Sequence, residues 1–228
     1  MRAAVYLGTR NLYRDMLSAM KSLAAHARVD KIYLLIEDPA FPFPLPELVE
    51  AIDVSGQSWI SRDAPAAASK WTWMGLLRCV YPLIFPELDQ IVSLDADTLV
   101  EGPVGDLWEL ELGDKLIAGC REPFNTFMTG RLYINTGVTV YNLAKMREEG
   151  TGAVMQKLAH ERDWLLSAQD ITNQACAGRI LELGSEYNVC PYTDPSFEVK
   201  VRHFAARDDW RELPEVRRWR ETPWRSIL

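Results

Sequence analysis

Short apolar runs alternate along the chain with segments whose apolar residues recur at helical spacing. Residues 3–7 and 31–36 are apolar runs, which predict buried strands. Between them, apolar residues from Leu12 to Ala27 fall on one helical face and charged residues on the other. The chain therefore opens as strand, helix, strand, which implies a parallel pair with a right-handed crossover.

Similar patterns continue to the end of the chain. Strands are predicted at 51–54, 91–94, 116–120, 133–143 with an interruption near Gly137, and 180–183; helices are predicted at 70–85, 151–161 and 168–176. Residues 38–46 form a proline-punctuated loop, whose apolar Phe41 and Phe43 indicate that it packs on the surface. We expect one α/β domain over residues 1–228, with a mostly parallel central sheet flanked by helices and a short helical tail.

The run at 91–94 ends on two acids, Asp95 and Asp97, which in an extended backbone point to the same face. Two close like charges repel, and a divalent cation removes that repulsion. Oxygen ligands suit Mg²⁺ or Mn²⁺. The alternative is a turn with two solvated acids, in which Asp95 caps the turn. Because ligands of such sheets bind at the carboxyl ends of strands, the segment from Leu7 to Tyr13 is expected to face the same site.

Composition narrows the class of protein. The chain has 228 residues and a formal net charge of −7, which disfavours a nucleic-acid partner. Its cysteines are far apart and show no metal-ligand spacing, as expected of reduced, buried thiols. No signal peptide and no apolar run of membrane-spanning length is visible, so we expect a cytoplasmic protein.

The segment 200–228 differs from the rest, with seven Arg and three Trp against five acids. It is compatible with a lid over the site, contact with an acidic membrane surface, or docking of an acceptor. The interspersed acids disfavour the membrane role. We expect the segment to pack on the domain, with Trp210 in the fold.

The order of these features resembles glycosyltransferase family 8, whose members are retaining enzymes with a GT-A fold. The resemblance runs from Val5 to Trp210. It is carried by the segments that follow in sequence: GTRNLY at 8–13, Arg78, FPELD at 85–89, LDAD at 94–97, YINTGV at 133–138, QDITN at 169–173 and VRHF at 201–204.

The resemblance implies a UDP-sugar donor, with Mn²⁺ or Mg²⁺ as cofactor. It implies that Thr9 hydrogen-bonds uracil and that Tyr13 stacks on it. The metal ligands would be Asp95, Asp97 and His203, and the imidazole favours Mn²⁺. Taken alone, a His in an apolar strand-like context is more often a core residue.

Further roles follow from the same resemblance. Arg78 would pair with the donor phosphates or order the site; its alternative is a weak salt bridge on a helix surface. Asn135 and Gln169 would hydrogen-bond the donor sugar, although Asn135 also suits backbone pairing at a bulge. Asp170 would join them, unless it is an acid favoured by the first turn of a helix.

Leu7 and Ala96 complete the expected donor-binding set. The chain departs from the family at Ala168, where many members have an acid. It also departs after His203, where Ala206 replaces a glycine and no lysine grips the diphosphate. Arg207 or Arg211 is our candidate for the missing cation.

The predicted function is transfer of a hexose (glucose, galactose or N-acetylhexosamine) from UDP to a glycan or lipid-linked saccharide, with retention by front-face attack. One alternative is a catalytically impaired nucleotide-sugar-binding protein, which the departures favour. The other is a haloacid-dehalogenase-type phosphohydrolase, because DADT at 95–98 matches the first four positions of that family's DxDxT signature; there, however, the motif normally follows the first strand.

Overall fold

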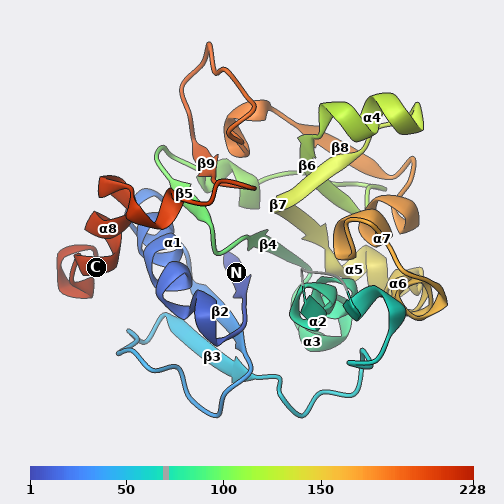
Figure 1. Cartoon of the computed structure of the whole chain (residues 1–228), viewed down its shortest axis with the longest axis horizontal. Helices are drawn as coiled ribbons and strands as arrows, with labels where there is room; N and C mark the ends of the chain where they lie inside the picture. The colour runs from blue at the N-terminus through green and yellow to red at the C-terminus, as the bar shows by residue number, and fades with distance from the viewer. Residues whose placement is uncertain (69–71) are drawn as a thin grey trace.

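The computed structural model describes residues 1–68 and 72–228, and its centre is a seven-stranded sheet (Figure 1). The strand order is β3-β2-β1-β4-β7-β6-β8. These strands span Ala3–Leu7 (β1), Lys31–Ile36 (β2), Val49–Asp53 (β3), Gln90–Leu94 (β4), Ile117–Arg121 (β6), Ile134–Asn142 (β7) and Ile180–Leu183 (β8). Only β7 runs against its neighbours, so the mixed α/β fold with a mostly parallel sheet is confirmed.

Helices cover both faces of the sheet, because its strands are apolar on both sides. One face carries α1 (Tyr13–His26), and the other carries α2 (Thr72–Gly75), α3 (Tyr81–Ile84), α5 (Leu143–Glu148), α6 (Thr151–Glu161) and α7 (Ala168–Ala175). Figure 1 also shows α4 (Pro123–Thr129) beyond the sheet edge near β8. Alternate residues of β1 point to opposite layers: Ala4 and Tyr6 face α1, whereas Val5 and Leu7 face the other helices.

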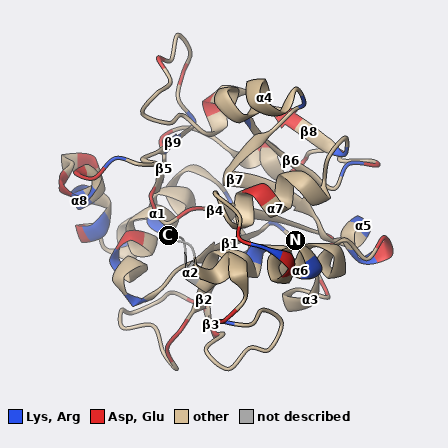
Figure 2. Cartoon of the chain, turned by 45° about the vertical axis from the view of Figure 1, so that its right-hand side comes forward, with Lys and Arg blue, Asp and Glu red and all other residues tan. Residues whose placement is uncertain are grey.

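A second, two-stranded sheet lies beside the first. It pairs β5 (Thr98–Val100) with β9 (Val201–His203) in antiparallel fashion. After β9 the chain turns onto α1. The ring of Trp210 stacks on Phe204 at 5.5 Å, and α8 (Pro214–Glu221) packs along α1. Basic and acidic residues are interspersed on α8 (Figure 2).

One sequence prediction of secondary structure is wrong. The segment 70–85, whose first two residues lie outside the described ones, is not one helix: α2, the 3-10 turn Leu76–Val80 and α3 follow one another. Pro82 explains the break, because it lacks an N–H and clashes with the preceding helical turn. The interruption expected near Gly137 appears in the pairing: β7 is one strand, but Gly119 of β6 pairs with Thr139 and the next residue, Cys120, pairs with Asn135, so residues 136–138 of β7 bulge out of that ladder.

Two other expectations are met. The loop 38–46 packs on the domain, where the ring of Phe41 lies 5.2 Å from that of Tyr13. All four cysteines are buried and free. In the described part of the chain, no helix is long and apolar enough to span a membrane.

Candidate active site

A cavity of about 510 Å³ opens where β1 and β4 end and the antiparallel β7 begins. This is a typical size for a small-ligand site. Predicted site residues that line it are Leu7, Thr9, Arg78, Asp95, Ala96, Asp97, Asn135, Gln169 and His203. The structure thus brings together residues from every part of the chain.

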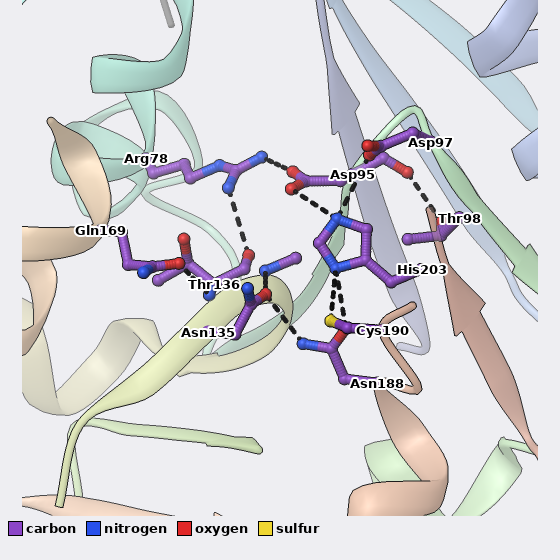
Figure 3. A network of polar contacts seen from close by, with 11 residues as sticks. Arg78, Asp95, Asp97, Thr98, Asn135, Thr136, Gln169, Asn188, Cys190 and His203 are labelled. Atoms are coloured by element: carbon purple, nitrogen blue, oxygen red, sulfur yellow. Dashed lines mark hydrogen bonds and ion pairs between the residues drawn. The ribbon is translucent and has the colours of Figure 1, made fainter. Parts of the chain in front are cut away.

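Asp95, Asp97 and His203 form a possible metal site at this edge (Figure 3). The pairing of β5 with β9 places Thr98 opposite His203, although the two are 105 positions apart in sequence. The Nε2 atom of His203 lies 3.6 Å from Asp95 Oδ2 and 3.4 Å from Asp97 Oδ1. One ligand atom from each of the three residues falls within 4.8 Å of the others.

The electrostatics of the triad fit a cation. Burial disfavours the charged imidazole, but the facing carboxylate of Asp97 outweighs this and holds the pKa of His203 well above its ordinary value. Burial likewise disfavours the charged form of Asp97, but His203 lowers its pKa overall. A divalent ion would supply the positive charge that a proton otherwise supplies. Two carboxylates and one imidazole are a donor set that suits Mn²⁺.

Gly137 explains how the imidazole reaches this position. A Cβ atom at Gly137 would lie 2.2 Å from Cε1 of His203, so only glycine leaves room for the ring. The carbonyl of the same glycine accepts a hydrogen bond of 2.8 Å from the N–H of Asp95. Gly137 therefore fixes both the histidine and the first acid of the pair.

Arg78 lies beneath the acids and is buried. Its guanidinium pairs with the carboxylate of Asp95 and donates to the carbonyl of Thr136 at 3.1 Å. Burial disfavours the charged guanidinium, but Asp95 more than compensates and the pKa of Arg78 lies above its ordinary value. Arg78 is thus a buried partner of the acid pair, and the alternative of a weak surface salt bridge does not describe it.

The two predicted amides are both anchored, each by its oxygen. Asn135 Oδ1 accepts from the N–H of Gly137 at 2.8 Å, and Gln169 Oε1 accepts from the N–H of Thr136 at 3.1 Å. Both residues line the cavity. Their place suits hydrogen bonding to a sugar, which remains a prediction.

Asp170 is turned away from the cavity. Its Oδ1 accepts from the Tyr133 hydroxyl at 2.5 Å, and its Oδ2 accepts from the N–H of Leu166 at 2.8 Å. It does not line the cavity with its neighbour Gln169. This geometry favours the alternative of an acid in the first turn of a helix.

Tyr13 is also held elsewhere. It is 2% exposed, its hydroxyl donates to Asp38 at 2.9 Å, and the same oxygen accepts from the N–H of Glu37 at 3.0 Å. Phe41 packs against its ring. The structure does not bring Tyr13 into the cavity, because α1 begins at this residue and directs it toward the end of β2.

The two candidate cations lie in different places. Arg211 lines the cavity, and its Nε donates to the buried Asp15 at 2.8 Å. Arg207 pairs with the exposed Asp209 and lines a neighbouring hollow instead. The geometry favours Arg211 as the cation of the site.

Ala206 keeps the backbone that a glycine favours. Its φ is +60°, in the left-handed region that alanine rarely adopts. Ala206 lines the cavity, as does Ala168. The departure at 206 has therefore changed the side chain and left the turn in place.

Several cavity residues had no signal in the sequence. Glu122 accepts from the N–H groups of Phe124 and Asn125 at 3.1 and 2.6 Å and so caps α4. Glu122, Asn125 and Tyr192 line the cavity. Only a Glu-Pro pair at a helix start could have pointed to the first of them.

Comparison with known proteins places this geometry in context. The sequence model of glycosyl transferase family 8 matches residues 44–208. Glycosyltransferase GlyE of Streptococcus pneumoniae is 30% identical over 166 residues, covering 69% of this chain and 39% of the relative. A putative glycosyltransferase of Haemophilus influenzae is 25% identical over 122 residues, covering 46% and 35%. The chain thus spans little more than a third of either relative.

Solved structures share the fold. The galactosyltransferase LgtC, crystallised with donor and acceptor sugar analogues, superposes with a TM-score of 0.73 at 18% identity, covering 99% of this chain and all of LgtC. The apo form of GlyE superposes with a TM-score of 0.75 at 23% identity, covering 99% of this chain and 61% of GlyE. At these identities the likeness establishes the GT-A fold alone.

Proposed function

The chain belongs to glycosyltransferase family 8, and on this basis we propose that it transfers a hexose from a UDP-sugar to a hydroxyl of a glycan or lipid-linked saccharide. The observation that carries the proposal is the triad of Asp95, Asp97 and His203 at the carboxyl edge of the sheet. Family membership also disfavours the phosphohydrolase alternative. The DADT segment follows β4 of a GT-A sheet, whereas in those phosphohydrolases the motif normally follows the first strand.

The departing diphosphate is the group that needs stabilisation. Mn²⁺ or Mg²⁺, when bound by the triad, supplies a Lewis acid for the developing negative charge. Arg211 adds a positive charge to the lining of the same cavity, held there by its ion pair with Asp15. Arg78 neutralises Asp95 from below and keeps its carboxylate oriented.

The sugar would lie against Asn135 and Gln169. Their oxygens are occupied by backbone N–H groups, and the nitrogen of Gln169 also donates to the Tyr133 hydroxyl at 3.4 Å. Each amide nitrogen carries two hydrogens, so both amides would still donate to sugar hydroxyls. A site that hydrogen-bonds a hydroxyl discriminates strongly against sugars that lack it. The two amides would therefore select the hexose.

Retention by front-face attack fits the carboxylates of the cavity. Among the described residues that line the cavity, Glu122 is the one carboxylate besides Asp95 and Asp97. Both oxygens of Glu122 accept backbone hydrogen bonds at the start of α4, so this acid is poorly placed to be a nucleophile. We therefore infer that the departing phosphate takes the proton of the acceptor hydroxyl.

Calorimetric titration of UDP, with Mn²⁺ and then with EDTA, tests the proposal. We expect binding that requires the metal and weakens by at least about 100-fold in Asp97→Ala, because the variant loses a metal ligand. Asp209→Ala, which removes an exposed acid outside the cavity, is the matched control and should bind UDP normally.

Equal binding in EDTA would contradict the metal role. Binding of UDP without transfer or hydrolysis of any UDP-sugar would instead support the alternative of an impaired nucleotide-sugar-binding protein.

A further inference from the structure

The histidine of the triad is held by a chain of hydrogen bonds behind the cavity (Figure 3). Its Nε2 faces the two carboxylates, and its Nδ1 lies 2.8 Å from Oδ1 of Asn188. The other end of that amide, Nδ2, lies 2.9 Å from Oδ1 of Asn135. Asn188 is 5% exposed and does not line the cavity.

One backbone group determines which atom donates and which accepts in each of these hydrogen bonds. The N–H of Gly137 lies 2.8 Å from the side chain of Asn135, and a backbone N–H can only donate. The Asn135 atom that it meets must be the oxygen. The Asn188 atom that meets the same oxygen must then be the donating nitrogen, which leaves the oxygen of Asn188 facing the imidazole.

The imidazole has no choice of tautomer in this arrangement. An amide oxygen only accepts, so Nδ1 of His203 carries a proton. In the neutral ring Nε2 is then bare, and its lone pair points at Asp95 and Asp97, which are acceptors as well. Three acceptors that converge without a hydrogen between them form a site for a cation.

We propose that Asn188 is a positioning residue that selects the metal-binding tautomer of His203 and, through Asn135, joins the metal site to the sugar end of the cavity. The inference rests on the proposed function in one respect, namely that the triad binds a divalent metal. The single buried amide of Asn188 contacts both parts of the site: its oxygen accepts from the metal ligand His203, and its nitrogen donates to Asn135.

Cys190 is the other neighbour of Nδ1 and does not serve this purpose. Its Sγ lies 3.7 Å from Nδ1, and a thiol is a weak hydrogen-bonding group. Cys190 is buried, like Asn188, and touches the same nitrogen. It therefore provides a matched control for effects of packing around the ring.

The test separates the two ends of Asn188 with two variants. Asn188→Leu removes both the acceptor and the donor, and we expect Mn²⁺ affinity to fall by about 10- to 100-fold, as for other partners of metal-ligating histidines. Asn188→Asp keeps the acceptor and loses the donor. It should retain Mn²⁺ affinity within about threefold but bind UDP-sugar less tightly relative to UDP, because Asn135 loses a partner.

Mn²⁺ binding is measured by electron paramagnetic resonance of the free ion, without nucleotide or acceptor. A failure of the proposed transfer reaction therefore does not affect this measurement, and absence of Mn²⁺ binding in the unmodified protein would count against the triad itself. Circular dichroism confirms that each variant is folded.

The tautomer can also be observed directly. The chain has three histidines, so long-range ¹H–¹⁵N spectra of the Mg²⁺-loaded protein resolve the ring of His203. We expect a proton on Nδ1 in the unmodified protein and in Asn188→Asp, and a mixture of forms in Asn188→Leu. Equal losses of Mn²⁺ affinity in both variants, or a loss in Cys190→Ala as large as in Asn188→Leu, would overturn the proposal.

Discussion

The metal triad of the cavity is positioned by paired strands, whereas Ala206 and Arg211, which line the same cavity, depend on a surface turn and an ion pair. On the metal side, β5 and β9 align His203 with the acids, and Gly137 leaves space for its ring. Arg211, by contrast, is placed by its ion pair with Asp15 of α1, and its side chain remains 43% exposed. Strand pairing and close packing allow side chains little displacement, whereas a partly exposed ion pair contributes only modestly to stability. Substitutions on the metal side should therefore cost more.

The largest effect is expected for Gly137→Ala. The new methyl group would overlap the ring of His203, so the histidine must leave the acids or the strands must separate. Overpacking of this kind costs about 1–3 kcal/mol of unfolding free energy. Metal affinity, measured by Mn²⁺ titration, should fall by at least about 100-fold because a ligand is displaced.

Gly56→Ala is the control for that substitution, because nothing lies within 4 Å of a Cβ atom built there. It should bind Mn²⁺ and unfold in urea like the unmodified protein. A Gly137→Ala protein with normal Mn²⁺ affinity would show that the contact with His203 does not position the metal ligand.

An intermediate effect is expected for Arg211→Ala. Loss of a cation beside the diphosphate should weaken UDP binding by about tenfold, the equivalent of one hydrogen bond to a charged group. Binding of uridine should be unchanged, because the nucleoside carries no phosphate. Calorimetry of both ligands measures the difference.

Arg207→Ala provides the comparison, since this arginine pairs with Asp209 outside the cavity. It should alter UDP binding by less than about twofold. If Arg207→Ala weakened UDP binding more than Arg211→Ala, then Arg207, our other candidate from the sequence, would be the cation that binds the diphosphate.

Local patterns in the sequence were sufficient for the framework of the fold. Residues 3–7, 31–36, 151–161 and 180–183 coincide with β1, β2, α6 and β8, because apolar runs and helical periodicity are local signals. The pairing of β5 with β9 is not local. It was accessible only through the resemblance, which already included His203 in the metal site.

The rest of the site depends on contacts between residues far apart in sequence, which no single position predicts. The sequence marks Gly137 only as an interruption of a strand, whereas in the structure the ring of His203 packs against this glycine. The residues next to Asn188 form no recognisable motif, and its proposed role follows from its hydrogen bonds to Asn135 and His203. Tyr13 shows the converse error, because the folding of the loop 38–46 over its ring decides that it is buried.

The smallest effect is expected for Ala206→Gly, which tests the surface turn that follows β9. A left-handed φ of +60° costs alanine about 1–2 kcal/mol relative to glycine. Glycine returns part of this by making the unfolded chain more flexible, so the net gain in unfolding free energy should be about 0.5 kcal/mol. Urea unfolding of the variant and of Ala205→Gly, whose φ is not positive, measures it. Stabilisation at 206 and destabilisation at 205 would show that the turn has kept a conformation suited to glycine, whereas equal losses at both positions would mean that Ala206 is not strained.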